Sequence, residues 1–293
     1  KVFDALDTDL TEGKPNTVGF LRRFREGRGP IRIRLSHLPE NRIQEIEEIL
    51  FSVERPVQER FFQGRSISFR RDDIELWPTD YYLCGGHGMT GVLVNARAET
   101  TIPGLFAAGD TACVHRGHLT GAFVFGQIAA ENAVAFAKSN ATASVDDEQV
   151  EAFQRKLAGI YGFRGRVGVD EFEYKTRRMI TDYITPPKNA TKLGEAIKWM
   201  RALGEEMGSV VYVRGCRDIF KVLEIENIMG CATISATASL ERKESRWGPF
   251  HYRVDYPQRD DDNWLKHIIV RRGNADTDVL VSYKDVEHME ALA

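Results

Sequence analysis

The sequence of 293 residues predicts a mixed fold, with an α/β part first and an antiparallel helical domain with a short β tail after it. Short apolar strands separated by glycine-bearing turns run from residue 66 to residue 110. The polar stretch 139–147 then separates them from four long segments whose apolar residues recur at helical spacing. Two apolar, strand-like segments follow in the last 30 residues.

The first part alternates between helix and strand. Apolar residues at helical spacing, among them Ile43, Ile46 and Ile49, predict a helix over 40–52. The full order expected here is a helix over 17–28, a strand over 31–35, the helix 40–52, strands over 66–70, 80–84, 91–95 and 104–108, and a helix over 121–138.

The second part is expected to hold helices over 148–160, 169–184, 191–207 and 216–241, and strands over 264–270 and 279–283. The polar stretch 139–147 is the best candidate for a domain boundary. The domains predicted from these changes in pattern are 1–70, 71–141 and 142–293.

Composition argues against several classes of protein. A formal net charge of -3 gives no electrostatic reason to expect nucleic acid or an anionic membrane as partner. No apolar run approaches the length of a transmembrane segment, so we expect a cytoplasmic protein, or one that reaches a membrane surface through its partners.

The four cysteines are too scattered for a metal or cluster site. None forms a C-x-x-C pair; they are Cys84, Cys113, Cys216 and Cys231. We therefore predict no metal ligands in this chain, and expect any iron–sulfur cluster to belong to another one.

The segment 101–110 (TIPGLFAAGD) carries the clearest chemistry. Gly109 ends an apolar strand at a point where the backbone can approach a ligand closely, and Asp110 can accept hydrogen bonds from sugar or ribityl hydroxyls. The stretch HRGHLTGA then leads from His115 into a helix whose N-terminal amides favour negative charge nearby.

Together with two further segments, this stretch resembles the fumarate reductase and succinate dehydrogenase flavoprotein family. One segment is PTDYYLCGG at 78–86, and the other is RKESRWGPFHYRVDYPQRDDDNW at 242–264. Residues 26–29 and 35–39 also look like the end of the family's capping domain. The resemblance covers nearly the entire chain.

The resemblance implies how the chain is divided and what it binds. Residues 1–70 would be a capping-domain remnant, 71–141 the C-terminal part of an FAD-binding domain, and 142–293 a helical C-terminal domain. FAD would be contacted by Gly86, Gly109, Asp110, Thr120, Gly121 and Ala122. The implied activity is electron-pair transfer between a small anionic substrate and FAD, with a ferredoxin-like iron–sulfur subunit as the electron partner.

The family's N-terminal G-x-G-x-x-G strand–helix unit is not in this sequence, which begins at Lys1 without a methionine. We interpret the chain as a C-terminal fragment that needs the missing N-terminal half, and expect it to bind FAD poorly and to be inactive alone. The run GHGMTG at 86–91 also matches G-x-G-x-x-G, but the strand-like residues after it argue against a dinucleotide fingerprint.

The substrate stays open between two enzyme classes. Where the family's dicarboxylate enzymes have a histidine, this sequence has Tyr81, and Arg116 is only a possible substitute for their carboxylate-binding arginine. His87 after the glycine pair, and the spacing of the motifs, resemble the adenylylsulfate reductase alpha-subunit branch more closely. The candidate catalytic residues are His87 as proton donor or stacking group, Arg116 as anion clamp, and His118.

A third interpretation is that the chain is a non-catalytic docking module, with Trp77, Trp247, Tyr252 and Trp264 at an interface. Within the segment 242–264, we expect Arg242, Arg246 and His251 to form structural ion pairs with Glu241, Glu244 or Asp255.

Overall fold

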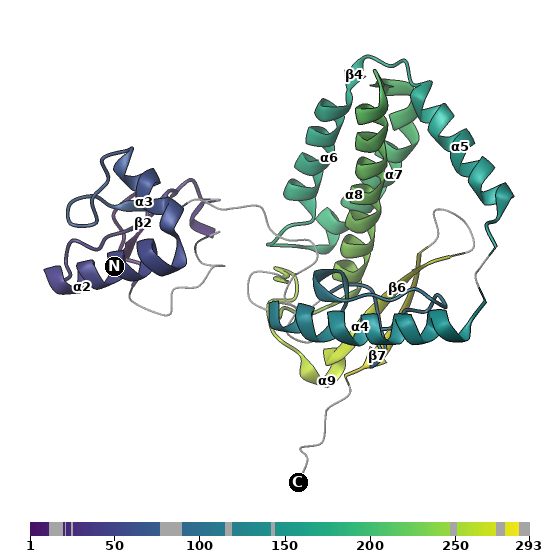
Figure 1. The fold of residues 1–293 in the computed structure, drawn as a ribbon. Helices are drawn as coiled ribbons and strands as arrows, with labels where there is room; N and C mark the ends of the chain where they lie inside the picture. Colours follow the sequence, from purple (N-terminus) through teal and green to yellow (C-terminus); the bar gives the residue numbers. More distant parts are fainter. Residues whose placement is uncertain are drawn as a thin grey trace, which may run out of the picture. The chain divides into compact units, whose positions relative to one another are not determined.

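The structure is a computed structural model and describes residues 1–11, 20, 22–24, 26–76, 90–114, 119–141, 144–246, 251–273 and 279–286. The chain forms two compact units, Lys1–Asp80 and Tyr81–Ala293, and each is described by itself. The fold is mixed α/β and mostly helical, as the sequence predicts (Figure 1). The three domains given above, and the two boundaries between them, remain predictions.

The first unit is built on a three-stranded antiparallel sheet in the order β1 (Val2–Phe3), β2 (Ile31–Ile33) and β3 (Ile74–Leu76). Val2 lies opposite Ile33, and Ile31 lies opposite Leu76. Helix α2 (Glu40–Glu48) continues into a π-helical turn, η1 (Ile49–Glu54), and α3 (Pro56–Gln63) follows. Among the described residues of this unit, the buried apolar side chains are Phe3, Ile31, Ile43 and Phe69.

The strand predicted over 66–70 is wrong. Residues 66–70 form turns, in which Ser66 has a φ of 55° and Asp72 accepts a hydrogen bond from the Ser68 amide. The alternation of apolar residues there has another cause, because Phe69 is buried against the rings of Phe51 and Phe62. Of the helix predicted over 17–28, only residues 20, 22–24 and 26–28 are described, and residues 20 and 22–24 are helical.

The helices of the second unit agree closely with their predicted ranges. They are α4 (Leu119–Ser139), α5 (Asp147–Tyr161), α6 (Val169–Tyr183), α7 (Ala190–Val210) and α8 (Cys216–Glu241). The buried residues of α7 recur every three or four positions and are Leu193, Ala196, Met200, Leu203 and Met207. These side chains pack against the similarly spaced buried face of α8, and Figure 1 shows α6, α7 and α8 side by side.

Short strands connect and extend this bundle. Strands β4 (Val167–Gly168) and β5 (Val211–Tyr212) pair in parallel beside the N-termini of α6 and α8. After the short helix α9 (Asp261–Trp264), β6 (Lys266–Arg272) and β7 (Val279–Asp285) form the antiparallel tail that the sequence predicts.

Three further strands predicted between residues 80 and 108 are not found among the described residues. The strands expected over 91–95 and 104–108 are wrong, because the structure has only the isolated bridges Val92–Ala112 and Glu99–Phe106 there. The strand expected over 80–84 lies outside the described residues.

The expectation that no segment could span a membrane needs correction. Helix α4 is long and apolar enough to do so, with a mean hydropathy of 1.2 over its most apolar 18-residue window, of which 6% is buried. Among the described residues, this helix meets the criterion of length and apolar composition for a membrane span. Core helices of soluble proteins meet the same criterion. It does not place α4 in a membrane.

Candidate functional site

The turn at Gly109 is held by backbone contacts on one side. Gly109–Thr111 forms a 3₁₀ turn, η2. The Val92 amide donates a hydrogen bond to Thr111 O at 2.8 Å, and the Cys113 amide donates one to Val92 O at 2.9 Å. Gly91 permits this approach, since a Cβ there would lie 2.6 Å from the Ala112 carbonyl carbon. The position of Asp110 is therefore set by the backbone.

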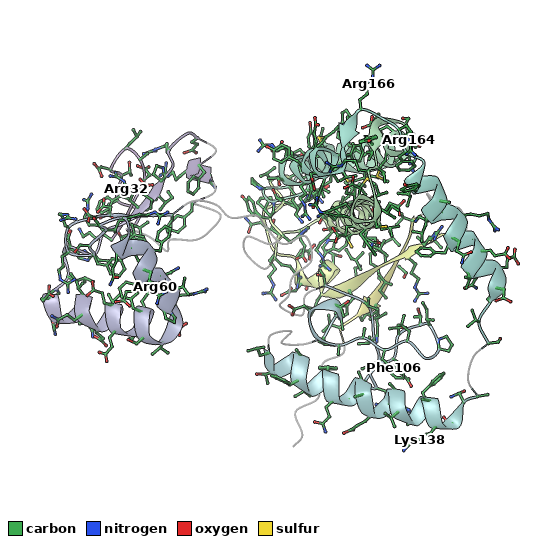
Figure 2. The ribbon with its side chains drawn as sticks, turned by 45° about the horizontal axis from the view of Figure 1, so that its top comes forward. Arg32, Arg60, Phe106, Lys138, Arg164 and Arg166 are labelled. Atoms are coloured by element: carbon green, nitrogen blue, oxygen red, sulfur yellow. The ribbon has the colours of Figure 1, made fainter. Side chains whose placement is uncertain are left out.

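Helix α4 lies against the other side of this turn. Gly109 has a φ of 68°, a left-handed conformation that favours glycine, and a Cβ there would meet the Ala122 methyl at 3.6 Å. The Phe106 ring packs edge-on against Phe136 with 6.3 Å between centroids, and Figure 2 shows Phe106 beside α4 toward the end that carries Lys138. Residues 106–109 therefore run along α4 in the opposite direction, which brings Asp110 toward the first turn of that helix.

Asp110 presents an exposed carboxylate at this place. Its side chain makes no hydrogen bond or ion pair with any other residue that the structure describes. In the first turn of α4, Thr120 is exposed, Gly121 is buried and Ala122 is half-buried. An acceptor for hydroxyl groups thus lies next to a helix N-terminus, where unpaired amides and the helix dipole favour an anion.

The other predicted site residues cannot be placed. Gly86, His87, Arg116 and His118 lie outside the described residues, as does Tyr81. Of the G-x-G-x-x-G match at 86–91, residues 90 and 91 are described. The residues that follow form the bridge Val92–Ala112 and no helix. That confirms the judgement that the run does not open a dinucleotide-binding helix.

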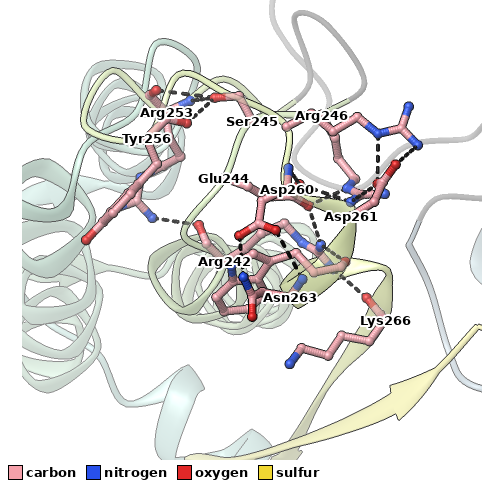
Figure 3. A network of polar contacts seen from close by, with 12 residues as sticks. Arg242, Glu244, Ser245, Arg246, Arg253, Tyr256, Asp260, Asp261, Asn263 and Lys266 are labelled. Atoms are coloured by element: carbon pink, nitrogen blue, oxygen red, sulfur yellow. Dashed lines mark hydrogen bonds and ion pairs between the residues drawn. The ribbon is translucent and has the colours of Figure 1, made fainter.

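A second cluster of chemically notable residues lies in the segment 242–264. Glu244 is fully buried and accepts hydrogen bonds from Arg242 Nη1 at 2.7 Å, from Arg246 Nη2 at 3.0 Å, and from the Asp260 amide at 2.9 Å (Figure 3). Burial acts to raise the pKa of the Glu244 carboxyl, but these donors outweigh it and lower that pKa overall. The ion pairs predicted for Arg242 and Arg246 are confirmed.

Arg253 closes the end of α8. Its Nη1 donates to the carbonyl oxygens of Ser239 at 2.6 Å, Arg242 at 3.1 Å and Leu240 at 3.2 Å, and Nη2 pairs with Asp255 at 2.7 Å. The guanidinium holds the pKa of the Asp255 carboxyl near 2. Carbonyls at a helix C-terminus lack helical partners, so a buried arginine stabilises them in place of water.

Lys188 and His251 complete this cluster. Lys188 is 5% exposed and donates to Ser239 Oγ at 2.8 Å, and burial together with Arg253 lowers its pKa to about 8. Burial and the cations Lys188, Arg242 and Arg253 lower the pKa of His251 to about 3. The ion pair predicted for His251 is therefore wrong: the imidazole is neutral, and its Nε2 has no hydrogen-bond partner among the described residues.

Sequence reasoning missed Lys188 and Arg253 as buried residues. Lys188 is 51 positions from Ser239, and no periodicity links residues so far apart. An Arg-x-Asp spacing such as Arg253 and Asp255 is also common on surfaces. The cluster ties the start of α7 and the end of α8 to the segment 244–261, and its role is structural.

Comparison with known proteins gives the family. Residues 174–292 match the family model described as fumarate reductase flavoprotein C-term. An uncharacterized FAD-dependent oxidoreductase of Methanocaldococcus jannaschii is 28% identical over 85% of this chain and 45% of its own length. The succinate dehydrogenase flavoprotein subunit of Rickettsia conorii is 26% identical over 90% of this chain and 46% of its own.

Solved structures have the same fold. The E. coli quinol fumarate reductase chain matches with a TM-score of 0.76 and 21% identity, covering 100% of this chain and 55% of that one. Adenylylsulfate reductase from Archaeoglobus fulgidus matches with a TM-score of 0.78 and 19% identity, covering 98% of this chain and 55% of that one. At these identities the likeness shows the fold alone, so the fold does not favour the adenylylsulfate reductase branch.

The chain is homologous to FAD-dependent oxidoreductases, and its fold is that of the fumarate reductase chain. The chain belongs to the fumarate reductase/succinate dehydrogenase flavoprotein family. It spans about half the length of the curated relatives it matches.

Proposed function

We propose that this chain is part of the flavoprotein subunit of a fumarate reductase/succinate dehydrogenase-type oxidoreductase. The activity is electron-pair transfer between a small anionic substrate and FAD, with electrons passed to or from an iron–sulfur subunit. The observation that carries the proposal is the exposed Asp110 carboxylate, which has no partner among the described residues and is presented by the 3₁₀ turn Gly109–Thr111 beside the first turn of α4 in a chain of this family.

The described residues fit one half of an FAD site. Gly109 and Gly121 are proposed as points where the backbone approaches the cofactor, and Asp110 would accept hydrogen bonds from ribityl hydroxyls. The N-terminal turn of α4, with Thr120 and Ala122, would favour the negative charge of a reduced flavin ring. Gly86 is proposed as a further contact. Bound FAD would supply the electron-pair chemistry, while the protein supplies position and electrostatics.

Substrate handling is assigned to residues beyond the described ones. His87 is proposed as proton donor or stacking group, Arg116 as the clamp for a substrate anion, and His118 as a further catalytic residue. In the same proposal, residues 1–70 belong to a capping domain, 71–141 to the FAD-binding domain and 142–293 to the helical C-terminal domain. The location proposed is the cytoplasm, peripheral to a membrane through partners.

The first test is the visible spectrum of the whole flavoprotein that contains this chain, purified and reconstituted with FAD. A flavin absorption band that stays with the protein through gel filtration is the expected result. The oxidoreductase proposal fails if no flavin is retained although the protein is folded by circular dichroism.

The second test concerns the substrate. Adenylylsulfate reductase-like chemistry is the alternative, because His87 follows a glycine pair and Tyr81 stands where dicarboxylate enzymes have a histidine. The FAD-loaded protein is assayed with a reduced dye for fumarate reduction and, separately, for adenylylsulfate reduction. Turnover of fumarate supports the first substrate class, while turnover of adenylylsulfate alone would move the protein to the alternative.

A further inference from the structure

The first unit contains a hollow of about 500 Å³ that the proposed oxidoreductase chemistry does not use. It lies between the end of α2, the π-helical turn η1, the helix α3 and residues 67–69. Its lining includes Glu47, Glu48, Phe51, Glu59, Phe62 and Phe69.

The floor of this hollow is aromatic. Phe69 is 2% exposed and packs against Phe51 with 5.7 Å between ring centroids and against Phe62 with 5.2 Å. Phe51 and Phe62 are half-buried, so parts of their rings remain accessible from the hollow. Aromatic ring faces carry a partial negative charge and attract cations.

The rim of the hollow is acidic and only partly neutralised. Glu47 pairs with Arg70 at 2.8 Å. Within the described part of the chain, no basic side chain pairs with Glu48 or Glu59, and Glu59 accepts only a hydrogen bond from Gln63 at 3.1 Å. Two carboxylates therefore stand beside an aromatic floor without a counter-charge.

The same surface already binds the protein's own guanidinium groups. Arg70 donates five hydrogen bonds of 2.6 to 3.0 Å to Glu40 and Glu47. Arg65 lies over the ring of Phe61, on the same helix as Phe62, at 3.8 Å from the ring centroid. Both contacts needed to hold an external guanidinium, carboxylate pairing and stacking on phenylalanine, thus occur next to the hollow.

We propose that this hollow is a docking site for an arginine side chain presented by a partner protein. A planar guanidinium can stack on Phe51 or Phe62 while its N–H groups donate to Glu48 and Glu59, which a compact lysine ammonium does less well. An apolar side chain would remove the carboxylates from water without pairing them, and an anion would be repelled.

The experiment uses the full chain and N-acetyl-arginine methylamide as the probe, followed by ¹H–¹⁵N NMR titration. Saturable shifts among residues 47–69 are expected, and the uncharged citrulline analogue should produce none. Glu48→Gln, Glu59→Gln and Phe62→Leu should each weaken binding about threefold, the effect of one exposed ion pair or cation–aromatic contact.

Glu45→Gln is the matched control, because Glu45 lies on α2 but pairs with Arg42 and does not line the hollow. It removes the same charge and should leave the affinity unchanged. Equal binding of the citrulline analogue would overturn the proposal, and so would an equal loss in Glu45→Gln and Glu48→Gln. If free L-arginine bound more tightly than the blocked probe, the ligand of the hollow would be a small molecule and the proposal of a partner protein would be overturned.

Discussion

Glu244 is the carboxylate that pairs with both Arg242 and Arg246 in the C-terminal segment. It is fully buried, and the side chains of Arg242 and Arg246 that bond to it are only 15% and 16% exposed. A buried carboxylate between two guanidiniums is costly to desolvate, but its removal leaves Arg242 without a carboxylate partner among the described residues and Arg246 with Asp261 alone.

We therefore predict that Glu244→Gln destabilises the helical part by about 3 kcal/mol. The measurement is urea denaturation followed by circular dichroism. Glu205→Gln, an exposed change on α7, serves as the control and should shift the midpoint little. An equal, small effect of both changes would show that Glu244 contributes nothing as an ion-pair centre.

His251 gives a pH dependence whose sign follows from its surroundings. Its pKa is lowered from 6.5 to about 3 in the folded protein, so between these values only the unfolded chain binds the proton. Stability is then fully present above pH 6.5 and falls as the pH drops toward 3, with a slope of about 1.4 kcal/mol per pH unit.

In His251→Gln, this part of the pH dependence should disappear, because the amide can still donate a hydrogen bond but does not titrate over that range. The measurement is the urea midpoint from pH 7 down to about pH 4, where Asp255 still keeps its charge. His37→Gln changes an exposed histidine and should keep the slope of the unaltered chain. A slope unchanged in His251→Gln would contradict the assignment.

At the scale of elements, Gly165 controls how β4 meets β5. A Cβ at Gly165 would lie 2.0 Å from the Val210 carbonyl oxygen, which is backbone and cannot rotate away. The Gly165 amide also donates to Val211 O at 2.9 Å, so the close approach is part of the pairing.

Gly165→Ala should therefore destabilise the second unit by about 2 kcal/mol or more, as overpacking against a fixed backbone does. Thermal unfolding followed by circular dichroism gives the measurement. Gly168→Ala is matched, since it lies three residues away and a Cβ there meets no atom within 4 Å. If both variants have the same melting temperature as the unaltered chain, the strand pair tolerates the added methyl group and the prediction is wrong.

Elements differed in how well the sequence predicted them. Helices α5 to α8 follow the predicted ranges because each repeats apolar residues every three or four positions along one buried face. Alternation over five residues was a poor guide, since Phe69 points inward from a turn and Val92 makes a single bridge. A strand needs a partner strand, and alternation does not say where that partner lies.

At the scale of the whole molecule, the test is whether Asp110 contributes to FAD binding in the complete flavoprotein. Asp110→Asn should raise the Kd for FAD about tenfold, the loss expected for charge-assisted hydrogen bonds. Because Asp110 is exposed and unpaired among the described residues, the far-ultraviolet spectrum and melting temperature should not change. Asp147→Asn, at the start of α5, is the control, and a Kd unaffected in Asp110→Asn would remove that residue from the site.

The sequence by itself determined the family, through three short motifs, and the helical second half, through apolar residues that recur along each helix. It also predicted ion pairs of Arg242 and Arg246 with one of three nearby carboxylates, and the structure shows that the partner is Glu244, two positions from each. The tertiary structure decided the rest. Lys188 meets Ser239 across 51 positions, Arg253 caps α8, and burial together with three nearby cations lowers the pKa of His251 so that it is neutral. Burial and charge at these residues come from distant segments, and no local pattern encodes them.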